Sequence, residues 1–351
     1  MQRVPVTDFL AVQKGKPRSD HSEGIPILDV RSPSEYRAGH IPGAHSFPLF
    51  SDEERAIVGT AYKQEGKEAA VKKGLKVIGP KMVCLIEEAE KLESTQFRVY
   101  CWRGGMRSES LSWLLGQYGF QTQVLEGGYQ AYRRQIQGFF KQKLPLKIVT
   151  GYTGAGKTVL LREMARQGAQ VVDLEALANH QGSAFGYQKS ESQPTTEHFQ
   201  NLLFQAFQTL DLNREIWLED ESMRIGNVNL NEALFHQMSQ APHVYIDVPR
   251  KDRLIHLVED YREVKPENLA KAIRVISKRL GKERTLAALA YIEEGGLNLA
   301  ADQILPYYDK YYKRSMDKKK ELIAERFTLR NRDYTALAKE VLGNIRGQGM
   351  P

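Results

Sequence analysis

The sequence feature that most constrains the fold of this chain is a glycine-rich octapeptide, Gly151-Tyr152-Thr153-Gly154-Ala155-Gly156-Lys157-Thr158. An apolar run at 146–150 precedes it and predicts a strand, and the run that starts at Val159 predicts a helix. In this strand–loop–helix context the spacing G-x-x-x-x-G-K-T lets backbone N–H groups curl around a phosphate group. Lys157 adds a positive charge, and Thr158 is placed to meet a phosphate-bound Mg²⁺. The octapeptide therefore predicts a phosphate-binding loop (P-loop), whose expected binding residues are Gly151, Gly154, Gly156, Lys157 and Thr158.

Acidic residues stand at the ends of further apolar runs in the same half of the chain. Three such runs predict strands: 171–175, 215–221 and 243–248. Strands that alternate with helices are typical of a parallel sheet. Glu219 and Asp220 are the first candidates to hold a metal ion or to order its waters, followed by Asp173. The alternative is that these acids cap helices or pair with nearby arginines. We predict no resident metal ion or other cofactor, and expect Mg²⁺ at the P-loop only as the companion of bound phosphate.

A second loop has the composition of a reactive site, Tyr100-Cys101-Trp102-Arg103-Gly104-Gly105-Met106-Arg107-Ser108. It follows a run that predicts a strand and precedes a run, 108–115, that predicts a helix. The amide N–H groups of such a loop, the helix N-terminus, Arg103 and Arg107 all favour an anion. The thiol of Cys101 is therefore expected to lose its proton more easily than a free cysteine and to act as a nucleophile. The alternative is a buried structural cysteine.

Length and composition bound the architecture. A chain of 351 residues is long enough for two domains. Pro145 breaks a helical stretch at a plausible junction, so we predict one domain at 1–138 and a P-loop domain with a helical C-terminal extension at 139–351. No apolar run approaches 18 residues, so no membrane span is expected. The only two cysteines, Cys84 and Cys101, suit a reducing compartment, and we expect a cytoplasmic protein.

Three further runs surround the Cys101 loop in a fixed order. They are Asp29-Val30-Arg31-Ser32-Pro33-Ser34-Glu35-Tyr36, Gly39-His40-Ile41-Pro42-Gly43-Ala44 and Leu125-Glu126-Gly127-Gly128-Tyr129. Together with the loop they resemble a rhodanese domain, which implies an N-terminal rhodanese-like domain with a parallel sheet. The resemblance also implies that Cys101 carries sulfur or selenium as a persulfide or perselenide, and that Asp29 and Arg31 brace the site. His40 is either a site group or a structural hydrogen-bonding residue.

Two basic segments are candidates for contact with a polyanion, which the net charge of +7 permits. The segment 50–82 is rich in Lys and is either a solvated helical insert or a docking surface. The segment 307–314 combines four tyrosines with three basic residues, and aromatic rings among cations suit RNA by stacking and phosphate contact. Further basic residues flank it: Arg274, Lys278, Arg279, Lys282, Arg284, Lys318, Lys319 and Lys320. The alternative is a solvated helix face whose tyrosines pack inward.

The fusion of a rhodanese-like unit with a P-loop unit is more specific than either part. Other runs of the pattern are Gly59-Thr60-Ala61-Tyr62-Lys63-Gln64, Asp173-Leu174-Glu175, His180 to Gly186, Leu218 to Ser222 and Tyr307-Tyr308-Asp309. Over nearly its whole length the chain closely resembles the tRNA 2-selenouridine synthase family. The resemblance implies a tRNA-binding transferase that acts on 2-thiouridine at the wobble position. It implies two steps, in which geranyl diphosphate supplies a geranyl group to the sulfur and selenophosphate then supplies the selenium that replaces it. Expected partners are thus tRNA, geranyl diphosphate, selenophosphate and the synthase that makes it.

The two reactive loops suggest how the steps divide. Alkylation turns the thiocarbonyl sulfur into a better leaving group, so geranylation prepares the carbon for displacement. Cys101 would carry the incoming selenium, and the P-loop would hold the diphosphate, with Lys157 stabilising the leaving pyrophosphate. A ten-carbon chain needs an apolar wall beside the phosphates, for which the candidates are Tyr152, Phe185, Tyr187 and Met223.

Three other functions stay open at this point. One is an ATP-dependent kinase or tRNA sulfurtransferase that uses a Cys101 persulfide. Another is a non-catalytic, nucleotide-regulated binding module. The third is a phosphatase, because Cys101 to Arg107 fits Cys-x5-Arg, although no general acid stands out and Tyr100 stands where tyrosine phosphatases have His.

Overall fold

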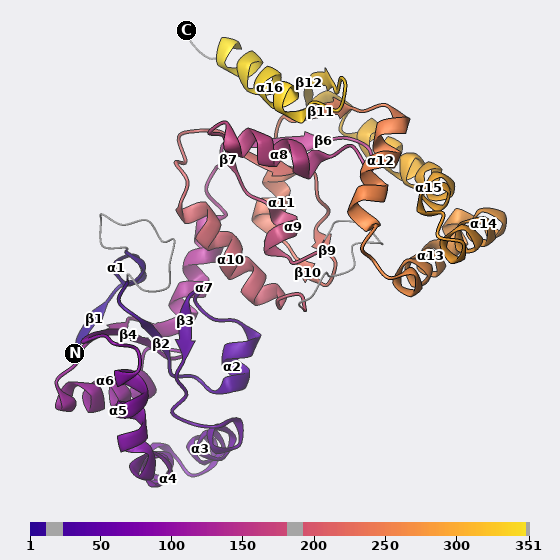
Figure 1. Ribbon diagram of the computed structural model, residues 1–351. Helices are drawn as coiled ribbons and strands as arrows, with labels where there is room; N and C mark the ends of the chain where they lie inside the picture. Colours follow the sequence, from indigo (N-terminus) through magenta and orange to yellow (C-terminus); the bar gives the residue numbers. More distant parts are fainter. Residues whose placement is uncertain (12–23, 181–191, 349–351) are drawn as a thin grey trace. The chain divides into compact units, whose positions relative to one another are not determined.

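The chain forms two compact units, each built around its own five-stranded parallel sheet (Figure 1). The structure is a computed structural model that describes residues 1–11, 24–180 and 192–348. Unit 1 comprises Met1–Phe139 and Gln200–Leu202, and unit 2 comprises Phe140–Phe199 and Leu203–Pro351. The predicted α/β class, with a parallel sheet in each half of the chain, is confirmed.

The sheet of unit 1 has the order β1-β5-β4-β2-β3, and all of its pairings are parallel. Its strands are β1 (Gln2–Val4), β2 (Ile27–Asp29), β3 (Ala44–Ser46), β4 (Gln96–Tyr100) and β5 (Gln121–Leu125). Asp29 of β2 pairs with Tyr100 of β4. This register brings the Asp29–Arg31 motif beside the start of the Cys101 loop, at the carboxyl ends of the strands, where open parallel sheets place their ligands.

Seven α-helices of unit 1 lie in the described part of the chain. They are α1 (Val6–Leu10), α2 (Pro33–Ala38), α3 (Asp52–Gln64), α4 (Lys67–Ile78), α5 (Met82–Glu90), α6 (Met106–Tyr118) and α7 (Gly128–Phe139). Because side chains alternate along a strand, Phe97 and Val99 of β4 share a face. Both pack in one core cluster with Leu85 of α5 and with Leu111 and Leu115 of α6. The helix that holds the Cys101 loop is thus fixed to the sheet by its apolar face.

The lysine-rich segment 50–82 is helical, as one of its two interpretations predicts. Helices α3 and α4 contact each other, and a short 3₁₀ turn, Gly79–Lys81, leads into α5. Ser51 caps α3, because its hydroxyl accepts a hydrogen bond from the N–H of Glu54 at 3.2 Å. Ile57 and Leu75 are exposed on this hairpin.

The sheet of unit 2 has the order β12-β11-β6-β8-β7 and is also parallel throughout. Its strands are β6 (Leu146–Thr150), β7 (Gln170–Val171), β8 (Ile216–Glu219), β11 (His243–Asp247) and β12 (Ile323–Thr328). The central strand β6 leads through the P-loop into α8 (Lys157–Arg166), as predicted. The prediction of a strand through residue 175 is wrong, because β7 ends at Val171 and Asp173 begins a helix, α9 (Leu174–Leu177).

Other elements of unit 2 surround this sheet. They are α10 (Thr196–Gln208), a hairpin of β9 (Arg224–Ile225) and β10 (Val228–Asn229), and α11 (Glu232–Met238). Between β11 and β12 the chain forms four helices that share one apolar core, α12 (Arg250–Tyr261), α13 (Pro266–Leu280), α14 (Lys282–Glu293) and α15 (Leu297–Lys318) (Figure 1). The extension is not wholly helical, because β12 follows α15 and joins the sheet before the last helix, α16 (Tyr334–Gln348). Across the described residues, we find no helix with the length and apolarity needed to cross a membrane.

Candidate active sites

Cys101 lies directly after β4, and only Trp102 to Gly105 separate it from α6. Its side chain is buried, with 3% of the residue exposed. Its Sγ atom lies 3.2 Å from the hydroxyl oxygen of Ser108. The Ser108 hydroxyl also lies 3.0 Å from the carbonyl oxygen of Gly105, to which it donates. One rotation of this hydroxyl therefore changes its acceptor from the carbonyl to the sulfur, so the hydroxyl can donate to an anion held at Cys101.

The run Leu125 to Tyr129 and the residue after it support the Cys101 loop through backbone hydrogen bonds. The N–H of Tyr129 donates to the carbonyl of Cys101 at 2.8 Å, and the N–H of Gln130 donates to that of Trp102 at 3.0 Å. Gly128 has φ +57°, and a Cβ there would lie 2.3 Å from the carbonyl oxygen of Cys101. Only glycine permits this approach, so the Gly-Gly-Tyr run sets the path of the loop backbone.

Asp29 and Arg31 form a buried ion pair beside the loop. The Arg31 guanidinium donates to both carboxylate oxygens of Asp29, with distances of 2.9 and 2.6 Å, and to the carbonyl of Gly39. The hydroxyl of Tyr100 donates to Asp29 at 2.7 Å, and the Arg31 guanidinium lies 3.9 Å from the centre of the Tyr129 ring. Burial opposes the charge of Arg31, but its bond to Asp29 holds the pKa above the ordinary value. With its donors engaged in this way, the pair is arranged to position the loop rather than to contact a substrate.

The other predicted residues of this site have different surroundings. Arg103 is exposed. Arg107 donates to the Glu35 carboxylate at 2.7 Å, and although burial disfavours the charge of Glu35, this bond lowers its pKa. The ring of His40 stacks on that of Tyr36 with centres 3.8 Å apart, its Nδ1 lies 3.0 Å from the Tyr36 carbonyl, and burial lowers its pKa. These contacts match the structural interpretation of His40.

The P-loop opens onto a cavity of about 280 Å³ in unit 2. Lys157 is buried there, and its Nζ atom lies 3.3 Å from Glu219. Burial opposes its charge, yet the hydroxyl of Tyr312 and the carboxylate of Glu219 raise its pKa. Gly156 has φ +65°, and a Cβ there would lie 2.2 Å from the hydroxyl oxygen of Tyr334. The loop thus presents a buried cation at the start of α8, where backbone N–H groups are free to bind an anion.

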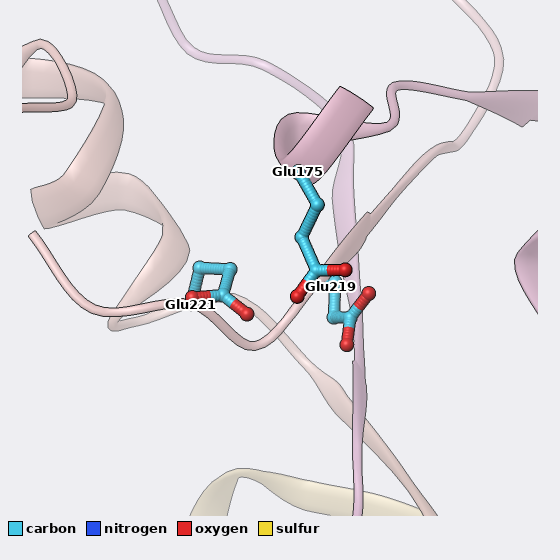
Figure 2. A group of neighbouring side chains, drawn as sticks. All are labelled: Glu175, Glu219 and Glu221. Carbon is cyan, nitrogen blue, oxygen red and sulfur yellow. The ribbon is translucent and has the colours of Figure 1, made fainter. Parts of the chain in front are cut away.

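Three glutamates gather at this cavity (Figure 2). Glu175 comes from the short helix α9, Glu219 from the end of β8 and Glu221 from the loop that follows, and their carboxylate oxygens lie within 4.8 Å of one another. Thr158 donates to Glu219 at 2.8 Å. Burial raises the pKa of Glu221 well above its ordinary value, and the charges of Glu219 and Glu175 raise it further. Carboxylate and hydroxyl oxygens are ligands that Mg²⁺ prefers, and a cation among the three glutamates would compensate their negative charges. The cluster therefore fits Mg²⁺.

The sequence singled out only one of these glutamates, Glu219. Glu175 and Glu221 are the last residues of two runs that predict strands, 171–175 and 215–221. The acidic ends of these two runs are the signal that could have found them. The other two acidic candidates lie elsewhere. Asp173 caps α9 by accepting from the N–H of Ala176 at 2.9 Å. Asp220 accepts from the hydroxyl of Thr150 at 2.7 Å and pairs with Lys319. Capping and pairing are the alternative roles that the sequence left open for them.

Known protein families match both units of the chain. The family model described as the tRNA 2-selenouridine synthase AAA domain matches residues 144–339, and the rhodanese-like domain model matches residues 13–135. The tRNA 2-selenouridine synthase of Psychromonas ingrahamii is 32% identical over 339 residues, which cover 86% of this chain and 91% of that protein. The chain belongs to the tRNA 2-selenouridine synthase family. It is therefore an enzyme of that type.

Two further members of the tRNA 2-selenouridine synthase family show similar identity. The protein of that name from Nitrosomonas europaea is 35% identical over 263 residues, which cover 71% of this chain and 66% of that protein. The one from Sulfurovum sp. is 34% identical over 296 residues, which cover 76% of this chain and 79% of that protein. The match thus extends across both units of the chain.

Two of the tyrosines of the segment 307–314 lie at the P-loop cavity of this family member. Tyr308 and Tyr312 line it, and Nζ of Lys157 lies 5.6 Å from the centre of the Tyr312 ring. This corresponds to the inward packing that the sequence left open. Of the residues expected to form an apolar wall, Tyr152 lies against the Arg253 guanidinium at 5.1 Å, and Met223 is partly buried before β9. Phe185 and Tyr187 lie outside the described residues.

Proposed function

We propose that this chain replaces the sulfur of 2-thiouridine at the wobble position of tRNA by selenium, through an S-geranyl intermediate. The observation that carries the proposal is that the chain has two separate reactive centres. One is the buried Cys101 loop of unit 1, and the other is the P-loop cavity of unit 2 with Lys157 and three glutamates. Two such centres suit a reaction in two steps that uses two different anionic donors. The names of the related proteins point to the same overall reaction.

The first step belongs to the P-loop cavity. The diphosphate of geranyl diphosphate would lie against the backbone N–H groups of the P-loop, with Lys157 beside it. The carbon–oxygen bond of the donor breaks, a bond forms between that carbon and the uridine sulfur, and pyrophosphate leaves. Lys157 contributes most where negative charge grows on the leaving group. A Mg²⁺ ion held by Glu175, Glu219 and Glu221 would supply further positive charge to the same phosphates.

The second step belongs to the Cys101 loop. Selenium has the same oxidation level in selenophosphate and in 2-selenouridine, so the exchange needs no external oxidant overall. Water attacks the phosphorus of selenophosphate, the phosphorus–selenium bond breaks, and phosphate leaves. A carbon–selenium bond then forms at C2 of the base, the bond from C2 to the geranylated sulfur breaks, and geranyl thiolate leaves and takes up a proton from water. Cys101 would hold the incoming selenium. The Ser108 hydroxyl oxygen lies 3.2 Å from Sγ of Cys101, so this hydroxyl is placed to stabilise an anion there.

The experiment that tests this function is mass spectrometry of wobble nucleosides. A 2-thiouridine tRNA is incubated with the purified chain and geranyl diphosphate, with selenophosphate, or with both. We expect geranylated nucleoside with the first donor and 2-selenouridine only with both. Lys157→Ala should reduce geranyl transfer by at least about 10²-fold, the effect typical of removing one charge-stabilising donor. Cys101→Ser should block selenation but leave geranylation intact, and the exposed Cys84 gives the matched control, Cys84→Ser.

ATP decides between this function and its main alternative. No ATP requirement is expected for geranyl transfer, because the P-loop would hold the prenyl donor itself. A strict ATP requirement with geranyl diphosphate inert would replace the proposal by an ATP-dependent tRNA sulfurtransferase.

A further inference from the structure

An apolar crevice adjoins the P-loop cavity within unit 2. The two hollows share four lining residues, the P-loop residue Thr153, Leu257 and Tyr261 of α12, and Tyr308 of α15. The crevice therefore begins at the wall of the phosphate site, and it continues into the core of the helices between β11 and β12.

The walls of the crevice are hydrocarbon apart from its rim. Beyond the shared residues, its lining comes from α13, α14 and α15 and includes Leu269, Ile273, Ile292, Ala301 and Ile304. No charged side chain lines it among the described residues, and its polar side chains, Thr153, Tyr261 and Tyr308, are all at the shared rim. Polarity thus falls from the Lys157 cavity to the interior of the helices along one path.

This gradient in polarity defines the chemistry of a ligand that would occupy both hollows at once. The edges of a nucleotide base need hydrogen-bond partners once they leave water, and the interior of the crevice offers none. A hydrocarbon tail needs none and gains by leaving water. We infer that the crevice is the subsite for the prenyl chain of an allylic diphosphate whose head group lies at Lys157. This inference rests on the proposed function, and it names the residues that select the donor.

The size of the crevice indicates which residues would limit the length of the prenyl chain that binds. Its volume is about 30 Å³, whereas a single water needs roughly 10–15 Å³ measured in this way. The first carbons of a prenyl chain therefore fit as the side chains stand, and a ten-carbon chain requires lining side chains to move. Ala301 of α15 is a small lining residue, and Ile273 of α13 is a large one. A larger residue at 301 shortens the subsite, and a smaller one at 273 lengthens it.

Calorimetry on the purified full-length chain tests the subsite directly. Its probes are inorganic pyrophosphate and prenyl diphosphates of five, ten and fifteen carbons. We expect the wild-type chain to bind the ten-carbon diphosphate at least tenfold more tightly than pyrophosphate. Ala301→Leu should weaken the ten-carbon ligand at least tenfold while pyrophosphate changes by less than twofold. Ile273→Ala should shift the preference toward fifteen carbons, an effect that mere loosening of the fold does not produce.

The matched control is Ala290→Leu, the same change on an exposed position of α14. It should alter none of the affinities, and thermal melting of each variant shows that it is folded. A chain that geranylates tRNA but binds five-carbon and ten-carbon diphosphates equally, or whose Ala301→Leu variant behaves like Ala290→Leu, overturns the subsite and leaves the proposed function standing. A chain that prefers the ten-carbon ligand and responds to Ala301→Leu, but transfers no geranyl group to tRNA, supports the subsite and overturns the proposed function.

Discussion

Arg253 of α12 and Asp309 of α15 are joined by two parallel hydrogen bonds, of 2.7 and 2.9 Å. The same guanidinium donates to the carbonyl of Thr153 in the P-loop at 3.2 Å. A Cβ on Gly154 would lie 2.6 Å from the carbonyl oxygen of Arg253, so the loop and α12 are in close contact. The P-loop is therefore held in place by Arg253 of α12, which lies 100 residues later in the chain than Thr153, and Asp309 of α15 in turn orients the Arg253 guanidinium.

We predict that Asp309→Ala destabilises the protein, because it leaves the buried guanidinium of Arg253 without its partner. The loss in the free energy of unfolding should be roughly 2–4 kcal/mol, at the lower end for a buried pair because the Asp309 side chain is 30% exposed. Chemical denaturation measures it. The double variant Arg253→Met/Asp309→Leu should recover part of the loss.

Arg250 and Asp302 give a matched control for this prediction. They join the same two helices at 2.8 Å, but their side chains are 49% and 38% exposed. Asp302→Ala should change the free energy of unfolding by no more than about 1 kcal/mol, as is usual for surface pairs. Equal losses in the two alanine variants would contradict the role given to Arg253.

A second prediction concerns the hydroxyl beside Cys101. Ser108→Ala removes a donor from the Cys101 sulfur, so alkylation of Cys101 at pH 7 should slow by roughly 10-fold or more, the equivalent of one hydrogen bond to a charged group. Ser108→Thr should restore the rate. The readout is the rate of alkylation at the Cys101 peptide, and the exposed Cys84 serves as the internal control. An unchanged rate in Ser108→Ala would show that the hydroxyl does not act on the sulfur.

A third prediction concerns pH and His256, which is buried beside the P-loop with its Nε2 atom 2.7 Å from the hydroxyl of Tyr334. Burial and the charge of Arg332 lower its pKa, against the opposing charges of Glu259 and Asp252. Its folded pKa therefore lies below the value of about 6.5 that it has in the unfolded chain. As the pH falls from this value, the unfolded chain takes up the proton first, and the free energy of unfolding decreases until the folded pKa is passed.

His256→Gln should remove this contribution. Because burial also lowers the pKa of His40 and His243, both chains lose stability in acid, and the informative quantity is the difference between them. We expect the wild-type chain to lose more stability than the variant between pH 7 and pH 5, measured by denaturation at each pH. A difference that stays constant across this interval would rule out the titration of His256.

A fourth prediction concerns the surface that contacts tRNA. Lys271, Arg274 and Lys278 lie three and four residues apart on the exposed side of α13. Each phosphate contact adds about 0.7–0.9 to the slope of log affinity against log salt. Replacing all three by alanine should flatten this slope by up to about 2.1–2.7, the sum of three such contacts. Filter binding of tRNA at several salt concentrations measures it.

The lysine-rich hairpin of unit 1 supplies the comparison for tRNA binding. Lys72 and Lys76 are exposed on α4. Their replacement by alanine should leave the slope unchanged, and a slope that responds to α4 but not to α13 would move the RNA site to the hairpin. Lys319, from the basic run at the end of α15, is less suitable for such a test because it pairs with Asp220.

Features whose cause is local in the sequence could be predicted. The P-loop follows from the glycine spacing between a strand and a helix, and the start of α2 at Pro33 follows from Ser32 and Glu35, whose carboxylate accepts from the Ser32 N–H at 3.0 Å. Features that depend on distant partners could not. Glu175 reaches the cavity because β7 ends before Asp173, and Asp173 caps the start of α9. The apolar run does not decide whether Asp173 caps a helix or continues the strand.

The last strand is a second case of this kind. The segment that forms β12 carries two adjacent charged residues, Glu325 and Arg326, and follows a lysine run, so nothing local indicates a place in a sheet. It becomes a strand because it pairs with β11, from which four helices separate it in the sequence. Likewise the apolar crevice needs α12 to α15 to be assembled, whereas the sequence directed attention to loop residues near the phosphates.

The position of β12 after β11 and four α-helices affects how the protein is made. A ribosome that has released residues up to Asp247 has delivered four of the five strands of this sheet, yet the edge of β11 still lacks its partner. The hydroxyl of Tyr334 in α16, which donates to the carbonyl of Ala155 in the P-loop at 3.0 Å, emerges later still. Nascent chains therefore cannot complete the phosphate site until β12 and α16 have been synthesised. A premature stop codon after α15 would give a protein with the whole P-loop motif but without the strand and the tyrosine that support it.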